Sequence, residues 1–190
     1  MTEKRTVGVA GLGHVGAHVA FCLGMMGVAD EILLCDVNEQ KAVSECQDLN
    51  DAVMYMPNHS FYRVVDYRGL KNADIIVNAV GDVSLCATGN RDDELGNSVR
   101  QVADYVPKVM AAGFHGIFVT ITNPCDVIAH LIAKISGLPR GRVVGTGTLL
   151  DSSRLVHAIS DQTGLDARGF FAFMMGEHGN AQMVPWSQVN

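Results

Sequence analysis

Four polar segments carry the side chains that could do chemistry. Asp151 and Arg154 are three residues apart, which places them on one face of a predicted helix. His178 stands in a Gly-Glu-His-Gly-Asn segment, Arg91 follows a Thr-Gly-Asn, and Asn123 precedes a proline. Arginine binds anions through paired hydrogen bonds and histidine exchanges protons near neutral pH, so these groups fit a single reaction.

Each of these side chains also has a purely structural interpretation. Asp151 and Arg154 could form a local ion pair within the helix. His178 could be a surface side chain, which is the better interpretation of a lone loop histidine without other support. Arg91 could be a solvated partner of the aspartates that follow it, and Asn123 could belong to a simple turn. The predicted strands and helices around these residues are therefore needed to distinguish a functional role from a structural one.

Apolar runs of strand length alternate with longer amphipathic segments along the chain. The predicted strands cover 6–10, 31–35, 61–65, 74–80, 116–121 and 143–144, and the predicted helices cover 15–26, 39–54, 95–112, 126–135 and 149–162. Pro107 is expected to kink the third helix or to start a new one. Strands that are apolar on both faces and alternate with helices are typical of a parallel sheet covered on both sides.

The sequence therefore predicts a doubly wound α/β domain over residues 1–147. After this domain the pattern changes, and residues 170–175 form an uncharged, β-prone run that predicts one further strand. Residues 148–190 are expected to be the first, incomplete part of a second, α+β domain. Because the predicted strand has no neighbours in the sequence, its edge is a candidate site of aggregation.

The composition excludes several classes of function. The chain has 190 residues, of which 48% are hydrophobic and 18% charged, so it can form a core and is not disordered. Lys and Arg number 14 against 20 Asp and Glu, and this net charge of −6 gives no broad case for nucleic acid or anionic membranes. No apolar run approaches the roughly 18 residues of a membrane helix. The five cysteines include no C-x-x-C pair, which favours reduced thiols in a cytoplasmic protein.

A glycine-rich turn predicts a nucleotide site. The segment Gly-Leu-Gly-His-Val-Gly at 11–16 follows a predicted strand directly and opens a helix. Gly11 would permit the tight turn, Gly13 would let the backbone approach a pyrophosphate, and Gly16 would let the helix pack on the strand. Asp36, twenty residues after Gly16, can accept both ribose hydroxyls and would repel a 2′-phosphate, which favours NAD over NADP. The alternative is a glycine turn with Asp36 capping the next helix.

Several segments together resemble the lactate/malate dehydrogenase family. They are the turn at 11–16, Asp36, and residues 123–127, 145–154 and 176–180. Within the family, Gly-Phe-His-Gly at 113–116 is similar to the L-2-hydroxyisocaproate dehydrogenase branch. The resemblance covers essentially the whole chain. It implies a cytoplasmic homo-oligomer, a dimer or tetramer, that uses NAD and no metal, with residues 148–190 beginning its substrate domain.

The resemblance also implies a role for each candidate side chain. His178 would donate the proton to the substrate carbonyl, and Asp151 would hold its imidazole in the right tautomer. Arg154 would bind the substrate carboxylate. Arg91 would polarise the carbonyl when the loop at 82–94 closes, and Asn123 would help to place substrate and nicotinamide. The residues implied to contact NAD are Gly11, Gly13, His14, Val15, Gly16, Asp36, Val80, Gly81, Ile121 and Asn123.

The loop at 82–90 bears on the substrate. In the malate branch a second arginine in this loop binds a second carboxylate, whereas residues 82–90 contain no cation. Val83, Leu85 and Cys86 favour an apolar substrate side chain. The expected reaction is therefore hydride transfer between NAD and a 2-hydroxy or 2-oxo monocarboxylic acid of the hydroxyisocaproate or lactate type. The alternatives are a malate dehydrogenase and a non-catalytic NAD-binding fragment or sensor, which the expected incompleteness would favour.

Overall fold

The computed structural model describes residues 4–82 and 91–190, and for 91–93 it describes the backbone alone. The strands are β1 (Thr6–Ala10), β2 (Glu31–Cys35), β3 (Phe61–Val64), β4 (Ile75–Asn78), β5 (Ile117–Thr120) and β6 (Val143–Gly145). The α-helices are α1 (His14–Met25), α2 (Glu39–Val53), α3 (Arg91–Ala111), α4 (Cys125–Ser136) and α5 (Leu149–Thr163). Among the described residues, short 3-10 helices cover Gly69–Asn72 and Trp186–Gln188. None of the described helices is long and apolar enough to cross a membrane.

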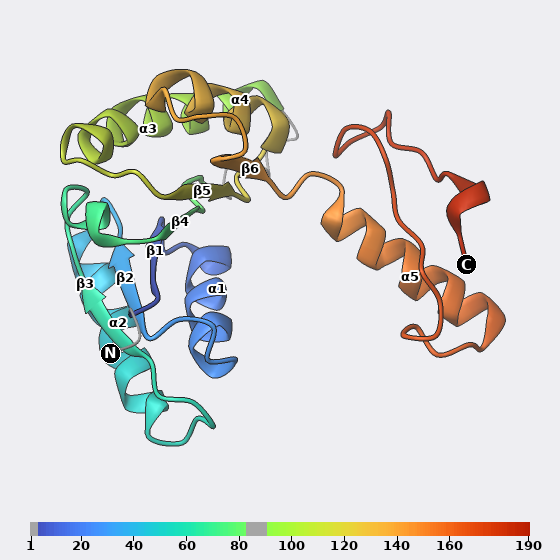
Figure 1. Cartoon of the computed structure of the whole chain (residues 1–190), viewed down its shortest axis with the longest axis horizontal. Coiled ribbons are helices and arrows are strands. Elements are labelled where there is room, and N and C mark those ends of the chain that lie inside the picture. Colours follow the sequence, from blue (N-terminus) through green and yellow to red (C-terminus); the bar gives the residue numbers. More distant parts are fainter. Residues whose placement is uncertain (1–3, 83–90) are drawn as a thin grey trace.

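The six strands form one parallel sheet in the order β3-β2-β1-β4-β5-β6 (Figure 1). This order confirms the predicted doubly wound α/β fold. The order reverses between β1 and β4, and ligands of such sheets bind beside that point, at the carboxyl ends of the strands. The ends are in register, since Ala10 pairs with Cys35 on one side and with Asn78 on the other.

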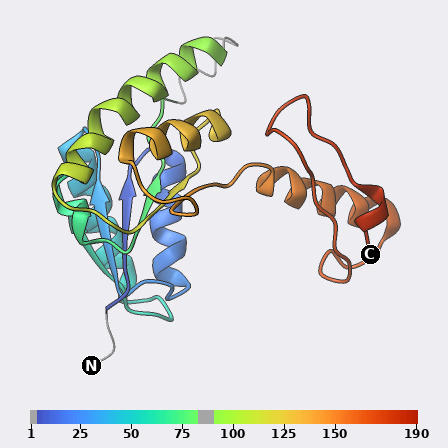
Figure 2. The same ribbon diagram turned by 45° about the horizontal axis from the view of Figure 1, so that its top comes forward.

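Helices cover both faces of the sheet because its strands are apolar on both faces (Figure 2). In β1, Val7 and Val9 point into a buried cluster that includes Ala20 of α1 and Leu49 of α2. Ala10 belongs to the other buried cluster, which is formed with the side chains of α3 and α4. The uninterrupted burial of β1 is the pattern expected of a central strand in a parallel sheet.

Helix α3 differs from the prediction in two ways. It continues unbroken through Pro107, where a kink or a new helix was expected. The fully buried Val102, Val106 and Val109 on either side pack into the core, and this packing outweighs the missing hydrogen bond of the proline. The helix also starts at Arg91, which was predicted to lie in a loop. The polar run at 91–94 was misleading because acidic residues are favoured in the first turn of a helix.

The predicted strand at 170–175 is wrong. Among the described residues this segment makes one isolated bridge, between Met175 and Met183, and a second backbone pair between Phe171 and Asn190. A strand needs a continuous hydrogen-bonded ladder, and two separate pairs do not form one. The β-prone residue types were therefore not sufficient to predict a strand.

Helix α5 and the residues after it stand apart from the sheet, joined to it by the linker that follows β6 (Figures 1 and 2). In α5 the buried residue is a charged one, Asp151, whereas Leu149 and Leu150 are exposed. A helix that buries a carboxylate and exposes leucines is not organised around an apolar core of its own. Its first turn instead organises a polar site.

Candidate active site

The turn between β1 and α1 is shaped by two glycines and open at a third. Gly11 has φ +90°, and a Cβ there would lie 2.7 Å from the backbone of Ala79 and Val80. A Cβ on Gly16 would lie 1.9 Å from the carbonyl oxygen of Gly11, so the helix start packs directly on the turn. A Cβ on Gly13 would meet none of the described atoms within 4 Å. The backbone is therefore accessible at Gly13, as binding of a pyrophosphate requires.

The N-terminus of α1 fits an anion. Gly13 is the N-cap residue, and among the described residues no side chain caps this helix. The first backbone bond of the helix joins the Ala17 N–H to the Gly13 oxygen at 3.0 Å. N–H groups in the first turn and the positive end of the helix dipole are thus directed at the space beside Gly13. His14 and Val15, the next two residues, are exposed at the same place.

Asp36 ties the end of β2 to the glycine turn. Its Oδ2 accepts a hydrogen bond from the Leu12 N–H at 2.6 Å, and its Oδ1 accepts one from the Asn38 N–H at 2.8 Å. The cap of α2 is Asn38, whose side chain accepts from the Lys41 N–H at 3.1 Å. Each carboxylate oxygen of Asp36 keeps a further lone pair, so the group can hold the turn and still accept ribose hydroxyls.

A buried polar network holds the turns that follow β4 and β5. The Asn78 amide donates to Oγ1 of Thr120 at 2.8 Å and to Oγ1 of Thr122 at 3.0 Å, and Tyr105 donates to Asn78 Oδ1 at 2.7 Å. Thr122 in turn donates to the Val80 oxygen at 2.7 Å. Burial, and after it the neighbouring Tyr67, raises the pKa of Tyr105 well above its ordinary value, so the hydroxyl keeps its proton.

Sequence reasoning missed this network, although polar residues inside apolar strands were a visible signal of it. The network fixes Val80 and the chain around Ile121 at the carboxyl edge of the sheet. Beside them a Cβ on Gly81 would meet none of the described atoms within 4 Å, and Asn123 is exposed, in front of a cis peptide bond to Pro124. Within the described part of the chain, the edge between β1, β4 and β5 is therefore exposed, as a ligand site requires.

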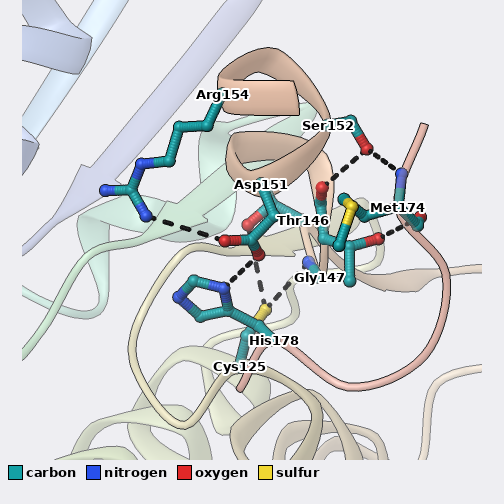
Figure 3. A network of polar contacts seen from close by, with 9 residues as sticks. Cys125, Thr146, Gly147, Asp151, Ser152, Arg154, Met174 and His178 are labelled. Carbon is teal, nitrogen blue, oxygen red and sulfur yellow. Dashed lines mark hydrogen bonds and ion pairs between the residues drawn. The ribbon is translucent and has the colours of Figure 1, made fainter. Parts of the chain in front are cut away.

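The second group of candidates meets at the start of α5 (Figure 3). Nδ1 of His178 is hydrogen-bonded to Oδ2 of Asp151, and Nη1 of Arg154 lies 3.6 Å from Oδ1 of the same carboxylate. The side chains of Asp151, His178 and Arg154 are 8%, 26% and 67% exposed. The carboxylate contacts the ring at Nδ1, and among the described residues no hydrogen bond reaches Nε2. The pair with Arg154 is long and its guanidinium is mostly in solvent, so it remains available to an anion.

The structure thus brings the candidates together in two groups. Gly11, Gly16, Asp36 and Val80 are assembled at the carboxyl edge of the sheet, and Asp151, Arg154 and His178 around one carboxylate. The side chain of Arg91 and the residues Val83, Leu85 and Cys86 lie outside the described part of the chain. The substrate preference inferred from that loop is therefore still a prediction.

The thiol of Cys125 lies between the end of β5 and the linker that follows β6. Its thiol accepts a hydrogen bond from the Gly147 N–H at 3.4 Å, lies 3.8 Å from Oγ1 of Thr146, and donates to the Thr120 oxygen at 3.4 Å. The buried thiol therefore connects the end of β5 with the linker that leads to α5. Figure 3 shows its contacts with Thr146 and Gly147.

Comparison with known proteins identifies the family. The family described as lactate/malate dehydrogenase, NAD binding domain, matches residues 5–145. The chain belongs to this family. The match confirms the family inferred from the sequence motifs and confirms NAD as the cofactor of the domain.

Similar proteins extend the likeness beyond the NAD-binding domain of the family. The L-lactate dehydrogenase of Fusobacterium nucleatum is 41% identical over 189 residues, which are 100% of this chain and 59% of that protein. L-lactate dehydrogenase 1 of Bifidobacterium longum is 44% identical over 99% of this chain and 59% of its own length. The crystal structure of the minor L-lactate dehydrogenase of Enterococcus mundtii matches with a TM-score of 0.91 and 33% identity, over 98% of this chain and 59% of that one. The chain therefore spans about 59% of the length of these relatives.

Proposed function

We propose that the protein acts as an NAD-dependent L-2-hydroxy acid dehydrogenase on a monocarboxylic acid of the lactate or hydroxyisocaproate type. The observation that carries the proposal is the hydrogen bond between His178 and Asp151 beside Arg154, in a chain that also has an NAD-binding domain. The names of the relatives, L-lactate dehydrogenases of two bacteria, support the same class of reaction.

In this proposal His178 supplies the proton of the reaction. The bound cofactor would supply the hydride as NADH during reduction of a 2-oxo acid and would accept it as NAD+ during oxidation of a 2-hydroxy acid. During reduction of a 2-oxo acid, Nε2 of His178 gives its proton to the carbonyl oxygen, which becomes the hydroxyl of the product. Asp151 holds the ring through Nδ1 and stabilises the protonated imidazole. In the oxidation direction Nε2 takes the hydroxyl proton back.

The remaining polar residues would bind and orient the substrate. Arg154 would exchange its long contact with Asp151 for two parallel hydrogen bonds to the substrate carboxylate, a geometry that lysine cannot reproduce. Arg91, at the start of α3, would stabilise negative charge on the carbonyl oxygen. Asn123 would contact both substrate and nicotinamide from the exposed end of the turn after β5.

The cofactor would lie along the carboxyl edge of the sheet. Its pyrophosphate would bind at Gly13, His14 and Val15, where the first turn of α1 is uncapped by the described side chains. Asp36 would accept the ribose hydroxyls. The nicotinamide half would lie toward the residues held by the turns after β4 and β5, namely Val80, Gly81, Ile121 and Asn123.

Substrate turnover tests the proposal directly. We expect NADH oxidation by the chain to be faster with 2-oxoisocaproate or pyruvate than with oxaloacetate, because a second carboxylate would enter a site whose loop offers no second cation. Steady-state absorbance assays with a panel of 2-oxo acids measure this ranking. A preference for oxaloacetate would instead assign a malate dehydrogenase.

A non-catalytic NAD-binding module is the second candidate. The observation that favours it is the exposure of Leu149 and Leu150 beside the Asp151 carboxylate, in a helix that stands apart from the sheet. A fully assembled active site excludes water around the reacting groups. Tight NADH binding without turnover of any 2-oxo acid in the panel would decide for the module.

Asp36 provides a second test, of cofactor choice. We expect Asp36→Asn to reduce the preference for NADH over NADPH by about tenfold, because the amide no longer repels a 2′-phosphate and accepts one ribose hydroxyl fewer. Fluorescence titration with both nucleotides measures the two dissociation constants. Asp74→Asn is the matched control, since Asp74 also accepts a backbone N–H, from Thr6 at 2.8 Å, but at the opposite edge of the sheet. An unchanged ratio in the Asp36 variant would remove Asp36 from the ribose site.

The proposal also includes location and assembly. The four described cysteines, Cys22, Cys35, Cys46 and Cys125, are all free thiols, which supports a reducing, cytoplasmic location. Phe21 and Met25, exposed apolar side chains on α1, support burial against a second copy in a homo-oligomer. Sedimentation velocity would distinguish a dimer or tetramer from a monomer.

A further inference from the structure

The backbone of Met174 is held on both sides by hydroxyl groups from one turn of α5. Oγ1 of Thr148 donates to the Met174 oxygen at 2.8 Å. The Met174 N–H donates to Oγ of Ser152 at 2.9 Å (Figure 3). The single hydroxyl proton of Ser152 goes to the Thr148 oxygen at 2.8 Å, which leaves a lone pair facing Met174. We call these three hydrogen bonds the Thr148–Ser152 clasp.

The clasp uses a threonine in an unusual way. Thr148 is the N-cap residue of α5, a position where a threonine hydroxyl ordinarily accepts from an N–H of the first turn. Among the described residues its side chain makes no such capping bond, and its hydroxyl proton is directed at Met174 instead. The Thr148 side chain therefore holds the segment around Met174 and does not cap the helix.

That segment leads directly into the loop that carries His178. Met175 and Met183 exchange two backbone hydrogen bonds, of 2.8 and 2.9 Å, and so close the loop at 176–182 at its base. The clasp holds the residue immediately before this base. Thr148 precedes Asp151 by three residues, on the same face of the helix, and Ser152 follows Asp151 directly in the sequence. One helical turn thus carries the carboxylate and both anchors of the loop that presents the histidine.

We propose that Thr148 and Ser152 are positioning residues that set the hydrogen bond between His178 and Asp151, and through it the proton transfer of the proposed dehydrogenase reaction. The loop is flexible by sequence, because His178 is separated by one residue from Gly176 and followed by Gly179. A loop anchored at its base has fewer positions available, so more of the population has the histidine against the carboxylate. The positioning of His178 does not depend on the proposed function, whereas the effect on proton transfer rests on it.

The spectroscopic test follows the His178 Nδ1 proton, which a hydrogen bond to a carboxylate shifts to low field and protects from exchange. It is identified as the low-field imidazole resonance of the 190-residue chain that disappears in His178→Gln. We expect Thr148→Val and Ser152→Ala each to reduce this resonance at least threefold in intensity. Thr148→Ser retains the hydroxyl and should restore it, and circular dichroism confirms that each variant is folded.

Ser160→Ala is the matched control. Ser160 also lies on α5 and donates from its hydroxyl to a following segment, at the Leu165 oxygen over 2.6 Å, but at the far end of the helix. Its loss should leave the His178 resonance unchanged. Full intensity in folded Thr148→Val and Ser152→Ala would overturn the proposal, as would an equal loss in Ser160→Ala.

Turnover of 2-oxo acids separates this inference from the proposed function. We expect kcat to fall at least tenfold in Thr148→Val and Ser152→Ala, with the dissociation constant for NADH unchanged. Loss of the resonance together with normal kcat would overturn the catalytic consequence of the clasp. Loss of the resonance in a chain that turns over no 2-oxo acid, even with the native sequence, would contradict the proposed function while supporting the positioning role.

Discussion

Replacing His178 by glutamine should lower kcat for 2-oxo acid reduction by about 100-fold or more, since general acid catalysis contributes 10²–10⁴-fold. A glutamine amide can still donate to Asp151, so the carboxylate is not left without its partner. It cannot release a proton to the substrate, however. Steady-state NADH oxidation measures kcat, and fluorescence titration should give an unchanged dissociation constant for NADH.

His157→Gln is the control for this variant. His157 is an exposed residue of α5, on the same helix as Asp151, and it takes no part in the hydrogen bonds around the carboxylate. Its replacement should leave kcat within a factor of about two. If His178→Gln retained a comparable share of the activity, another group would have to deliver the proton.

The sheet was predictable because each strand carries its own signal. A parallel strand buried on both faces needs a short uninterrupted apolar run, and β1, β2 and β4 have one. The turn at 11–16 was predictable for an equally local reason. Gly11 needs its positive φ and Gly16 its close approach to the strand, and both requirements are met within six residues of sequence.

Features that depend on distant partners were not predictable in this way. Asn78 meets Thr122 across 44 residues and Tyr105 across 27, and no periodicity indicates such a meeting. The hydroxyl clasp on Met174 spans 22 and 26 residues. The strand predicted at 170–175 was wrong because a strand also depends on a distant partner. Its residue types suit a hydrogen-bonded ladder, but the described residues offer it no partner strand.

The proposed site has two parts, the carboxyl edge of the sheet and the loop at 176–182 that carries His178. In the proposed function, the cofactor would lie along an edge of the sheet that is held by buried hydrogen bonds of Asn78 and Thr122. The proposed catalytic group of Asp151, Arg154 and His178 would instead be held by the two hydroxyls at the start of α5. Interactions of part-buried groups open more readily than those of a core. We therefore expect substitutions at Thr148 and Ser152 to lower kcat more than they lower the free energy of unfolding.

The glycines of the turn should separate stability from cofactor binding. In Gly16→Ala the new Cβ would lie 1.9 Å from the Gly11 oxygen, so backbone has to move. Such overpacking destabilises a protein by about 3 kcal/mol, which lowers Tm by roughly 6–12 °C for a domain of this size. Binding of NADH should weaken as well, because the turn that presents the N–H groups is displaced. Thermal unfolding monitored by circular dichroism measures the first effect.

Gly13→Ala should give the opposite combination. Its Cβ would meet none of the described atoms within 4 Å, so the free energy of unfolding should change by less than about 1 kcal/mol. The methyl group would occupy the space through which a pyrophosphate reaches the backbone, and NADH affinity should fall by about tenfold or more. NADH binding equal to that of the native chain would place the pyrophosphate elsewhere. Gly13 and Gly16 lie in the same turn, so the two variants can be compared directly. If Gly13→Ala is as stable as the native chain and still loses NADH affinity, the cause is the methyl group beside the backbone and not a disturbed fold.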